Sequence, residues 1–190
     1  MGKTFQDRVK DWLTGEPIRT KLLDYADSRG ITGDTYDRNL SEEERELFKL
    51  TEAYGRVLTR KAMKVLGERY EDYSLESYVD GRFTSGGTFN DLETKVRYYE
   101  LNSNTREWAW VVEAPKYEEM MKNGAWLINV FPNPDDFTNA WFYLWEVPET
   151  PPVDVVITSG KSVAKKHTGT KTKNDKGWFL KDAVISGYTE

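Results

Sequence analysis

The sequence contains no cysteine and only one histidine, His167. Without cysteine, disulfide bonds, thiol catalysis and Cys-ligated zinc sites are excluded. A single histidine also excludes His-rich metal sites and multi-histidine mechanisms. Any bound metal ion must therefore be held by oxygen ligands, which favours Mg²⁺, Mn²⁺ or Ca²⁺.

Long hydrophobic runs are also missing. No apolar stretch approaches the roughly 20 residues that a transmembrane helix needs. The N-terminal segment MGKTFQDRVKDWL is amphipathic and charged, unlike a secretory signal. We therefore expect a cytoplasmic protein with no membrane partner. Its 190 residues are 38% hydrophobic and 14% aromatic, which suits a folded chain with a real core rather than a disordered one.

Charge is distributed unevenly along the chain. Residues 161–190 hold seven lysines and three acids, whereas the preceding 160 residues hold 20 basic and 29 acidic residues. Two interpretations of this basic segment stay open, a localised contact for a polyanion and a solvated lysine-rich loop. Because aromatic residues are not interleaved with these lysines, the first interpretation predicts phosphate contacts rather than base reading. The candidate nucleic-acid-binding residues are Lys161, Lys165, Lys166, Lys171, Lys173 and Lys176.

Hydrophobic periodicity predicts helices and strands in an interleaved order. The longest helix starts at Ser41, where Ser41 and Glu44 form a capping-box pattern, and ends near Gly67. Proline and glycine positions bound a helix over 115–124. Its length suits a parallel crossover between strands. Further helices are expected over 5–15 and 17–30, strands over 125–131, 137–147 and 153–158, and closing core residues at Trp178, Phe179 and Leu180.

The stretch Tyr73–Leu101 reads as two strands joined by a glycine turn, with Asp80 near the end of the first strand. Since side chains alternate across a strand, Glu93 and Lys95 share one face of the second strand, and the apolar side chains face the other way. Two carboxylates and a lysine at one end of a hairpin predict a divalent metal site with a built-in cation.

In this order of elements, the segments YVDGRF and DLETKV resemble the PD-(D/E)XK nuclease superfamily, which includes restriction enzymes, junction resolvases and phage recombination nucleases. The resemblance covers about residues 41–147. It implies an α/β (α+β) restriction-endonuclease-like αβββαβ core with a mixed central sheet. The expected organisation is an N-terminal helical segment (1–40), the core (41–150) and a basic C-terminal extension packed on the core (151–190).

The resemblance assigns Asp80 and Glu93 as ligands of Mg²⁺ or Mn²⁺, and Lys95 as the residue that orients or deprotonates water. Several such families also carry a glutamate on the first helix, shortly after a Gly-Arg pair, but Thr59 stands near that place here. Glu52, two turns earlier on a similar face, is the substitute. Asp91 shares the face of Glu93 and competes for the metal.

Three functions follow from these observations. The first is a Mg²⁺-dependent endodeoxyribonuclease, for which a restriction or resolvase role would favour a homodimer. The second is a catalytically inactive nuclease-like module that binds nucleic acid or protein, for example a phage-encoded inhibitor. The third is an unrelated α+β interaction protein in which the hairpin has no chemical role.

Overall fold

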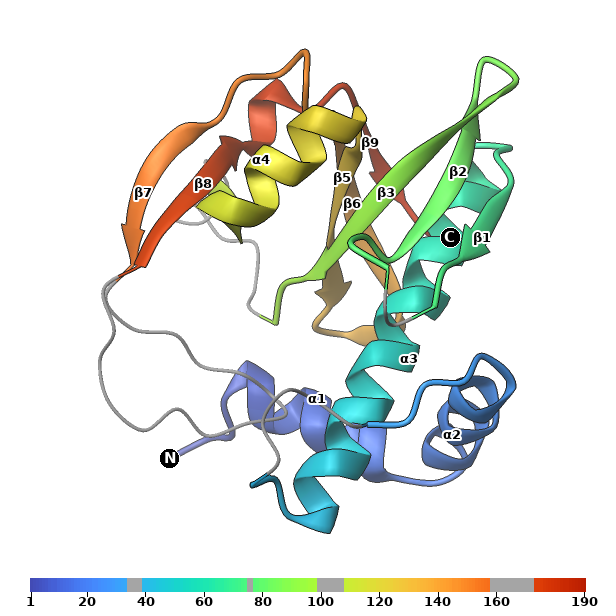
Figure 1. Cartoon of the computed structure of the whole chain (residues 1–190). Coiled ribbons are helices and arrows are strands. Elements are labelled where there is room, and N and C mark those ends of the chain that lie inside the picture. The colour runs from blue at the N-terminus through green and yellow to red at the C-terminus, as the bar shows by residue number, and fades with distance from the viewer. Residues whose placement is uncertain (34–38, 75–76, 99–107, 158–172) are drawn as a thin grey trace.

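A computed structural model of the chain describes residues 1–33, 39–74, 77–98, 108–157 and 173–190. It shows a mixed α/β fold built on two sheets (Figure 1). The helices are α1 (Phe5–Thr14), α2 (Ile18–Ser28), α3 (Glu42–Val65), α4 (Ala114–Asn123) and the 3₁₀ helix η1 (Leu180–Asp182). The strands are β1 (Tyr70–Asp72), β2 (Gly81–Ser85), β3 (Thr88–Val96), β4 (Trp108–Glu113), β5 (Trp126–Asn133), β6 (Asp136–Glu146), β7 (Val153–Ile157), β8 (Lys173–Phe179) and β9 (Ile185–Tyr188).

Local signals set the helix ends. The predicted capping box of α3 is present, because the Ser41 hydroxyl accepts from the Glu44 N–H and the Glu44 carboxylate accepts from the Ser41 N–H. Helix α4 ends at Gly124, which adopts a left-handed conformation with φ 66°. The predicted helices over 41–67 and 115–124 are thereby confirmed to within a few residues.

The main sheet has six strands in the order β1-β2-β3-β5-β6-β9. All neighbours are antiparallel except β3 and β5, which are parallel with α4 in the connection between them. The predicted parallel crossover is therefore confirmed. A second sheet of three antiparallel strands, in the order β4-β8-β7, was not predicted.

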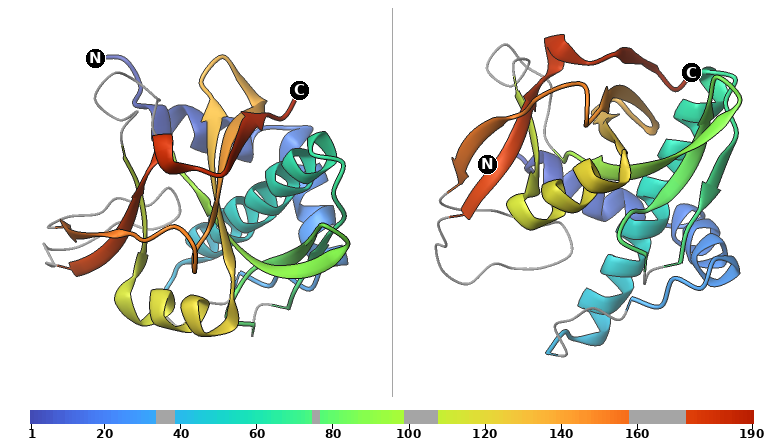
Figure 2. Two further views of the ribbon diagram at one scale, coloured as in Figure 1. Left: turned by 90° about the horizontal axis from the view of Figure 1, so that it is seen from above. Right: turned by 45° about the horizontal axis from the view of Figure 1, so that its top comes forward.

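Other elements cover both faces of the main sheet (Figure 2), and a hydrophobic core lies on each face. On one face, helices α1–α3 pack against Leu92, Ile128 and Phe142. On the other face, Leu127 and Trp145 pack against residues from α4 and the C-terminal segment. Trp178 and Leu180 lie in this second core, as the sequence predicts. In the described part of the chain, no helix is long and apolar enough to cross a membrane.

The predicted hairpin is correct in its turn and second strand and wrong in its first strand. Gly86 and Gly87 have φ of 59° and 81°, and Ser85 pairs with Thr88, so a two-residue turn joins β2 and β3. However, β2 begins only at Gly81. Asp80 therefore immediately precedes the first strand of the hairpin and does not lie near its end.

The residues before Gly81 belong to the connection between β1 and β2 and not to a long first strand. The Tyr73 N–H donates to the Asp80 carbonyl at 2.9 Å, which closes this segment into a loop. The missed strand β1 takes its place and pairs Tyr70 with Phe83. Gly81 fits because its Cα lies against β1, where an added Cβ would stand 2.5 Å from the Glu71 carbonyl oxygen.

Candidate functional site

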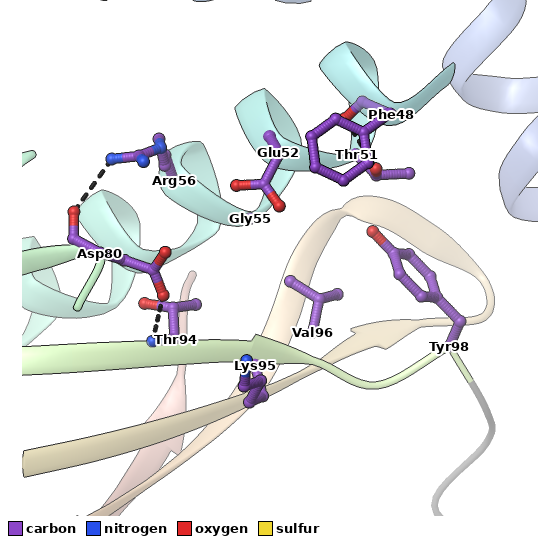
Figure 3. A pocket seen from close by; sticks show the side chains of 10 residues that line it. All are labelled: Phe48, Thr51, Glu52, Gly55, Arg56, Asp80, Thr94, Lys95, Val96 and Tyr98. Atoms are coloured by element: carbon purple, nitrogen blue, oxygen red, sulfur yellow. Dashed lines mark hydrogen bonds between the residues drawn. The ribbon is translucent and has the colours of Figure 1, made fainter. Parts of the chain in front are cut away.

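A cleft of about 230 Å³ lies between α3 and β3 (Figure 3). Helix α3 approaches β3 closely at Gly55, where an added Cβ would be 3.0 Å from Val96 Cγ2. Charged groups come together in the cleft from three elements that are separate in the sequence. The lining residues are Phe48, Thr51, Glu52, Gly55, Arg56, Asp80, Thr94, Lys95, Val96 and Tyr98.

Asp80 is held at both its backbone and its side chain. Its carbonyl oxygen accepts from Arg56 Nη1 at 2.9 Å, in addition to the Tyr73 N–H. Its carboxylate Oδ2 accepts from the Thr94 N–H at 2.8 Å, so the side chain points at the middle of β3 (Figure 3). Arg56 is itself buried, at 4% exposure. The loop before β2 therefore presents the Asp80 carboxylate to β3 in one fixed orientation.

The Asp80 carboxyl is difficult to ionise. Burial and the nearby Glu93 carboxylate raise its pKa to about 7, although Lys95 and the Thr94 N–H act in the opposite direction. The Asp80 and Glu93 carboxylates therefore repel each other. A divalent cation between them would relieve that repulsion.

Glu93 projects from the face of β3 that lies opposite α3, as the predicted alternation requires. Its residue is 3% exposed, and its carboxylate lies between two ammonium groups. Oε1 is 2.8 Å from Lys95 Nζ, and Oε2 is 3.1 Å from Lys116 Nζ. Oε2 is buried and makes this ion pair without a hydrogen bond. Hard cations prefer carboxylate oxygens, and Oε2 could ligate one in place of Lys116.

Lys95 stays charged in this environment. Burial alone would lower the pKa of its ammonium, but the Glu93 and Asp80 carboxylates raise it above the ordinary value. The Lys95 side chain is 35% exposed, pairs with Glu93 and borders the cleft, so it is open to an incoming ligand. Glu93 and Lys95 therefore act as one charged unit beside Asp80.

Glu52 is the acid that α3 contributes to the cleft (Figure 3). Burial raises its pKa, with Arg56 and Lys95 opposing that effect and Glu93 adding to it. Thr59, in contrast, is fully buried, and its hydroxyl bonds to the Gly55 carbonyl and lies 3.1 Å from Thr94 Oγ1. The structure thus places the proposed substitute Glu52 beside Asp80 and Lys95.

Asp91 is engaged by two tyrosines. Its Oδ1 accepts from Tyr73 Oη at 2.7 Å and its Oδ2 accepts from Tyr78 Oη. These bonds fix the loop before Asp80 to β3. Among the described residues, no three Asp, Glu or His side chains converge in a way that would hold a metal ion unaided.

The basic C-terminal segment is described only in part. Lys161, Lys165, Lys166 and Lys171 lie outside the described residues, and Lys173 belongs to β8. Lys176 is paired with Asp154 and lies 5.5 Å from the Tyr117 ring centre. Lys176 is therefore an ion-pair partner within the small sheet.

Sequence reasoning missed Lys116 and Arg56 as parts of the site. A signal for Lys116 exists, because it stands in the first turn of the crossover helix, which returns along the face of the sheet that bears Glu93. Arg56 follows Gly55 in the Gly-Arg pair, but its bond to the Asp80 carbonyl depends on a loop that the sequence pattern describes as strand.

Comparison with known proteins identifies no relative, since no protein-family model, curated protein or solved structure matches this chain.

Proposed function

We propose that the protein is a metal-dependent nuclease that cleaves phosphodiester bonds in DNA. The observation that carries this proposal is the meeting of Asp80, Glu93 and Lys95 beside the cleft that α3 forms with β3. Two carboxylates whose charges repel and one retained ammonium form a site for a divalent cation and a phosphate.

The order of the elements supports this proposal. The segment α3-β1-β2-β3-α4-β5 has the αβββαβ order, apart from the inserted β4, which belongs to the second sheet. Strands β1, β2 and β3 form an antiparallel meander, and β5 lies parallel to β3. The acids stand at the start of β2 and on β3, as in the PD-(D/E)XK superfamily that the sequence resembles.

The donor set fits Mg²⁺ or Mn²⁺. Mg²⁺ commonly takes one or two carboxylates and completes its coordination with water and substrate phosphate. Asp80 and Glu93 Oε2 would supply these carboxylates, with Glu52 across the cleft. A bound cation would stabilise negative charge on the scissile phosphate and lower the pKa of a bound water.

The chain's own residues supply the remaining functions. Lys95 keeps its proton, so it orients the attacking water and stabilises the negative charge that develops on the phosphoryl oxygens rather than deprotonating the water. Arg56 holds the backbone of Asp80 and so fixes where that carboxylate stands. Hydrolysis adds water across one P–O ester bond and leaves a phosphate and a hydroxyl end.

A second candidate function is a nuclease-like module that binds nucleic acid or protein without cleavage. The observation in its favour is that no three acidic or histidine side chains converge among the described residues. A protein with this function would have the same fold and would bind phosphate through its basic side chains, but it would not cleave the nucleic acid.

Cleavage of supercoiled plasmid in Mg²⁺ or Mn²⁺ tests the two candidates. The variants are Asp80→Asn and Lys95→Met, and the matched controls are Glu71→Gln and Lys122→Met, at exposed positions outside the cleft. Nicking that both controls retain and both site variants lose supports the nuclease. Nicking that survives in both site variants shows a contaminant and refutes it. DNA binding by the wild-type protein without nicking supports the second candidate.

A further inference from the structure

Lys116 is in contact with the buried acid of the candidate site. Its Nζ lies 3.1 Å from Glu93 Oε2, and the other carboxylate oxygen is 2.8 Å from Lys95 Nζ. Both oxygens of Glu93 thus face an ammonium group. Glu93 can therefore ligate a metal cation through Oε2 only if the Lys116 ammonium moves away.

Of these two lysines, Lys116 is the better placed to move. It stands on α4, a different element from Glu93, and its side chain is 30% exposed. It also donates to the Tyr78 carbonyl, so it keeps a partner when it leaves Glu93. Its contact with Oε2 is an ion pair without a hydrogen bond. Because the lysine side chain has a flexible four-carbon stem, this change of rotamer costs little free energy.

The charges of the site explain what Lys116 does after it moves. The single carboxylate of Glu93 is already flanked by two cations, Lys95 and Lys116. A divalent cation adds two positive charges, which an anion must offset in a partly buried site. The phosphodiesters of a nucleic acid are such anions.

We propose that Lys116 occupies Glu93 Oε2 in place of a divalent cation, and that it turns to a phosphate of the nucleic acid when that oxygen ligates the cation. This inference rests on the proposed function. It makes Lys116 a substrate-binding residue, and it makes the divalent cation and the nucleic acid bind cooperatively. By linkage, each strengthens the binding of the other by the same factor.

Titration of Mn²⁺ into the full chain by calorimetry, without nucleic acid, tests the first half of this proposal. Lys116→Gln is expected to bind Mn²⁺ about threefold to tenfold more tightly than the wild type, because a competing positive charge is removed. Lys116→Arg keeps the charge and should stay close to the wild type. Lys122→Gln, at an exposed position on the same helix, is the matched control and should also leave the affinity unchanged.

Binding of a short DNA duplex in Ca²⁺ tests the second half. Lys116→Gln should bind the duplex several-fold more weakly, and the slope of log affinity against log salt should fall by about one. The duplex should also raise Mn²⁺ affinity less in Lys116→Gln than in the wild type. Circular dichroism and thermal melting establish that each variant is folded.

The outcomes separate this inference from the proposed function. If the wild type binds Mn²⁺ and Lys116→Gln binds it no more tightly, the role of Lys116 is refuted and the metal site stands. An unaltered salt slope for Lys116→Gln refutes the phosphate contact. If neither the wild type nor any Lys116 variant binds Mn²⁺, both the metal site and the inference fall.

Discussion

Replacing Asp80 by Asn is expected to stabilise the protein at alkaline pH, because the wild-type carboxylate is ionised there in a site that opposes its charge. The pKa of Asp80 is about 7 in the folded protein, against 3.8 for the ordinary group. Between these two values the folded state binds more protons than the unfolded state, so stability falls as pH rises through this window. The cost is complete above about pH 7 and absent below about pH 4.

The size of the effect follows from the same pKa values. At 1.36 kcal/mol per pH unit, the difference between 3.8 and about 7 corresponds to roughly 4 kcal/mol. Water in the cleft screens part of this energy, so we expect a gain of about 1–3 kcal/mol for Asp80→Asn near pH 8. For a chain of this length, that gain raises Tm by about 3–9 °C. The asparagine Oδ1 can still accept from the Thr94 N–H, so the loop should keep its conformation.

Thermal and urea unfolding of the wild type and Asp80→Asn, near pH 5 and near pH 8, measure this effect. The control Glu71→Gln, at an exposed position on β1, should show no such pH-dependent gain. Mg²⁺ at about ten times its Kd should stabilise the wild type near pH 8 by about 1.4 kcal/mol and leave Asp80→Asn nearly unchanged. A variant no more stable than the wild type near pH 8, or equally stabilised at both pH values, would show that Asp80 carries no such electrostatic cost.

Three further substitutions test the framework around the site, each by the free energy of unfolding. Asp72→Asn should cost about 3–5 kcal/mol, because its 4% exposed carboxylate lies 3.5 Å from the equally buried Arg56 guanidinium and replacing it leaves that buried positive charge without this ion pair; a loss below about 1 kcal/mol would contradict this. Gly81→Ala should cost more than about 2 kcal/mol, since its Cβ would stand 2.5 Å from the Glu71 carbonyl oxygen; a stable variant with unchanged Mg²⁺ binding would refute the close packing. Trp178→Ala should cost about 3–5 kcal/mol through the lost ring and its bond to the Thr150 carbonyl; a neutral result would mean that the second core does not depend on this ring.

Sequence patterns correctly predict those helices and turns that are determined by residues close together in the sequence. The Ser41 capping box, the Gly86-Gly87 turn and the helix ended by Gly124 depend on residues within a few positions of one another. These elements could be predicted because neighbouring residues determine them. The parallel pairing of β3 with β5 is not local, and it was predicted from the length of the helix in the connection between the two strands.

The segment before Asp80 could not be predicted in this way. Its alternating residues are typical of a strand, but the structure bends them into a loop through contacts with distant elements. Arg56 on α3 and Lys116 on α4 both bond to carbonyl groups of this loop, at Asp80 and Tyr78. The three-stranded sheet was missed for the same reason, since β4 and β8 pair across more than 60 residues.

Packing between α3 and β3 determines which position on α3 can carry an acid for the site. Thr59 lies in a closed contact between α3 and β3, with its hydroxyl 3.1 Å from Thr94 Oγ1 and no exposed surface. A carboxylate there would be buried against the strand at a high cost. Towards its N-terminus, beyond Gly55, α3 and β3 enclose the cleft, and Glu52 lines it together with Asp80. The helix position at which related families carry a glutamate after their Gly-Arg pair therefore lies, in this chain, in the closed contact between α3 and β3. An acid on α3 can ligate a metal ion only where α3 and β3 enclose the cleft. Asp80, Glu52 and Lys95 line this open part of the cleft, whereas Glu93 is buried on the opposite face of β3 and joins the group through its ion pair with Lys95.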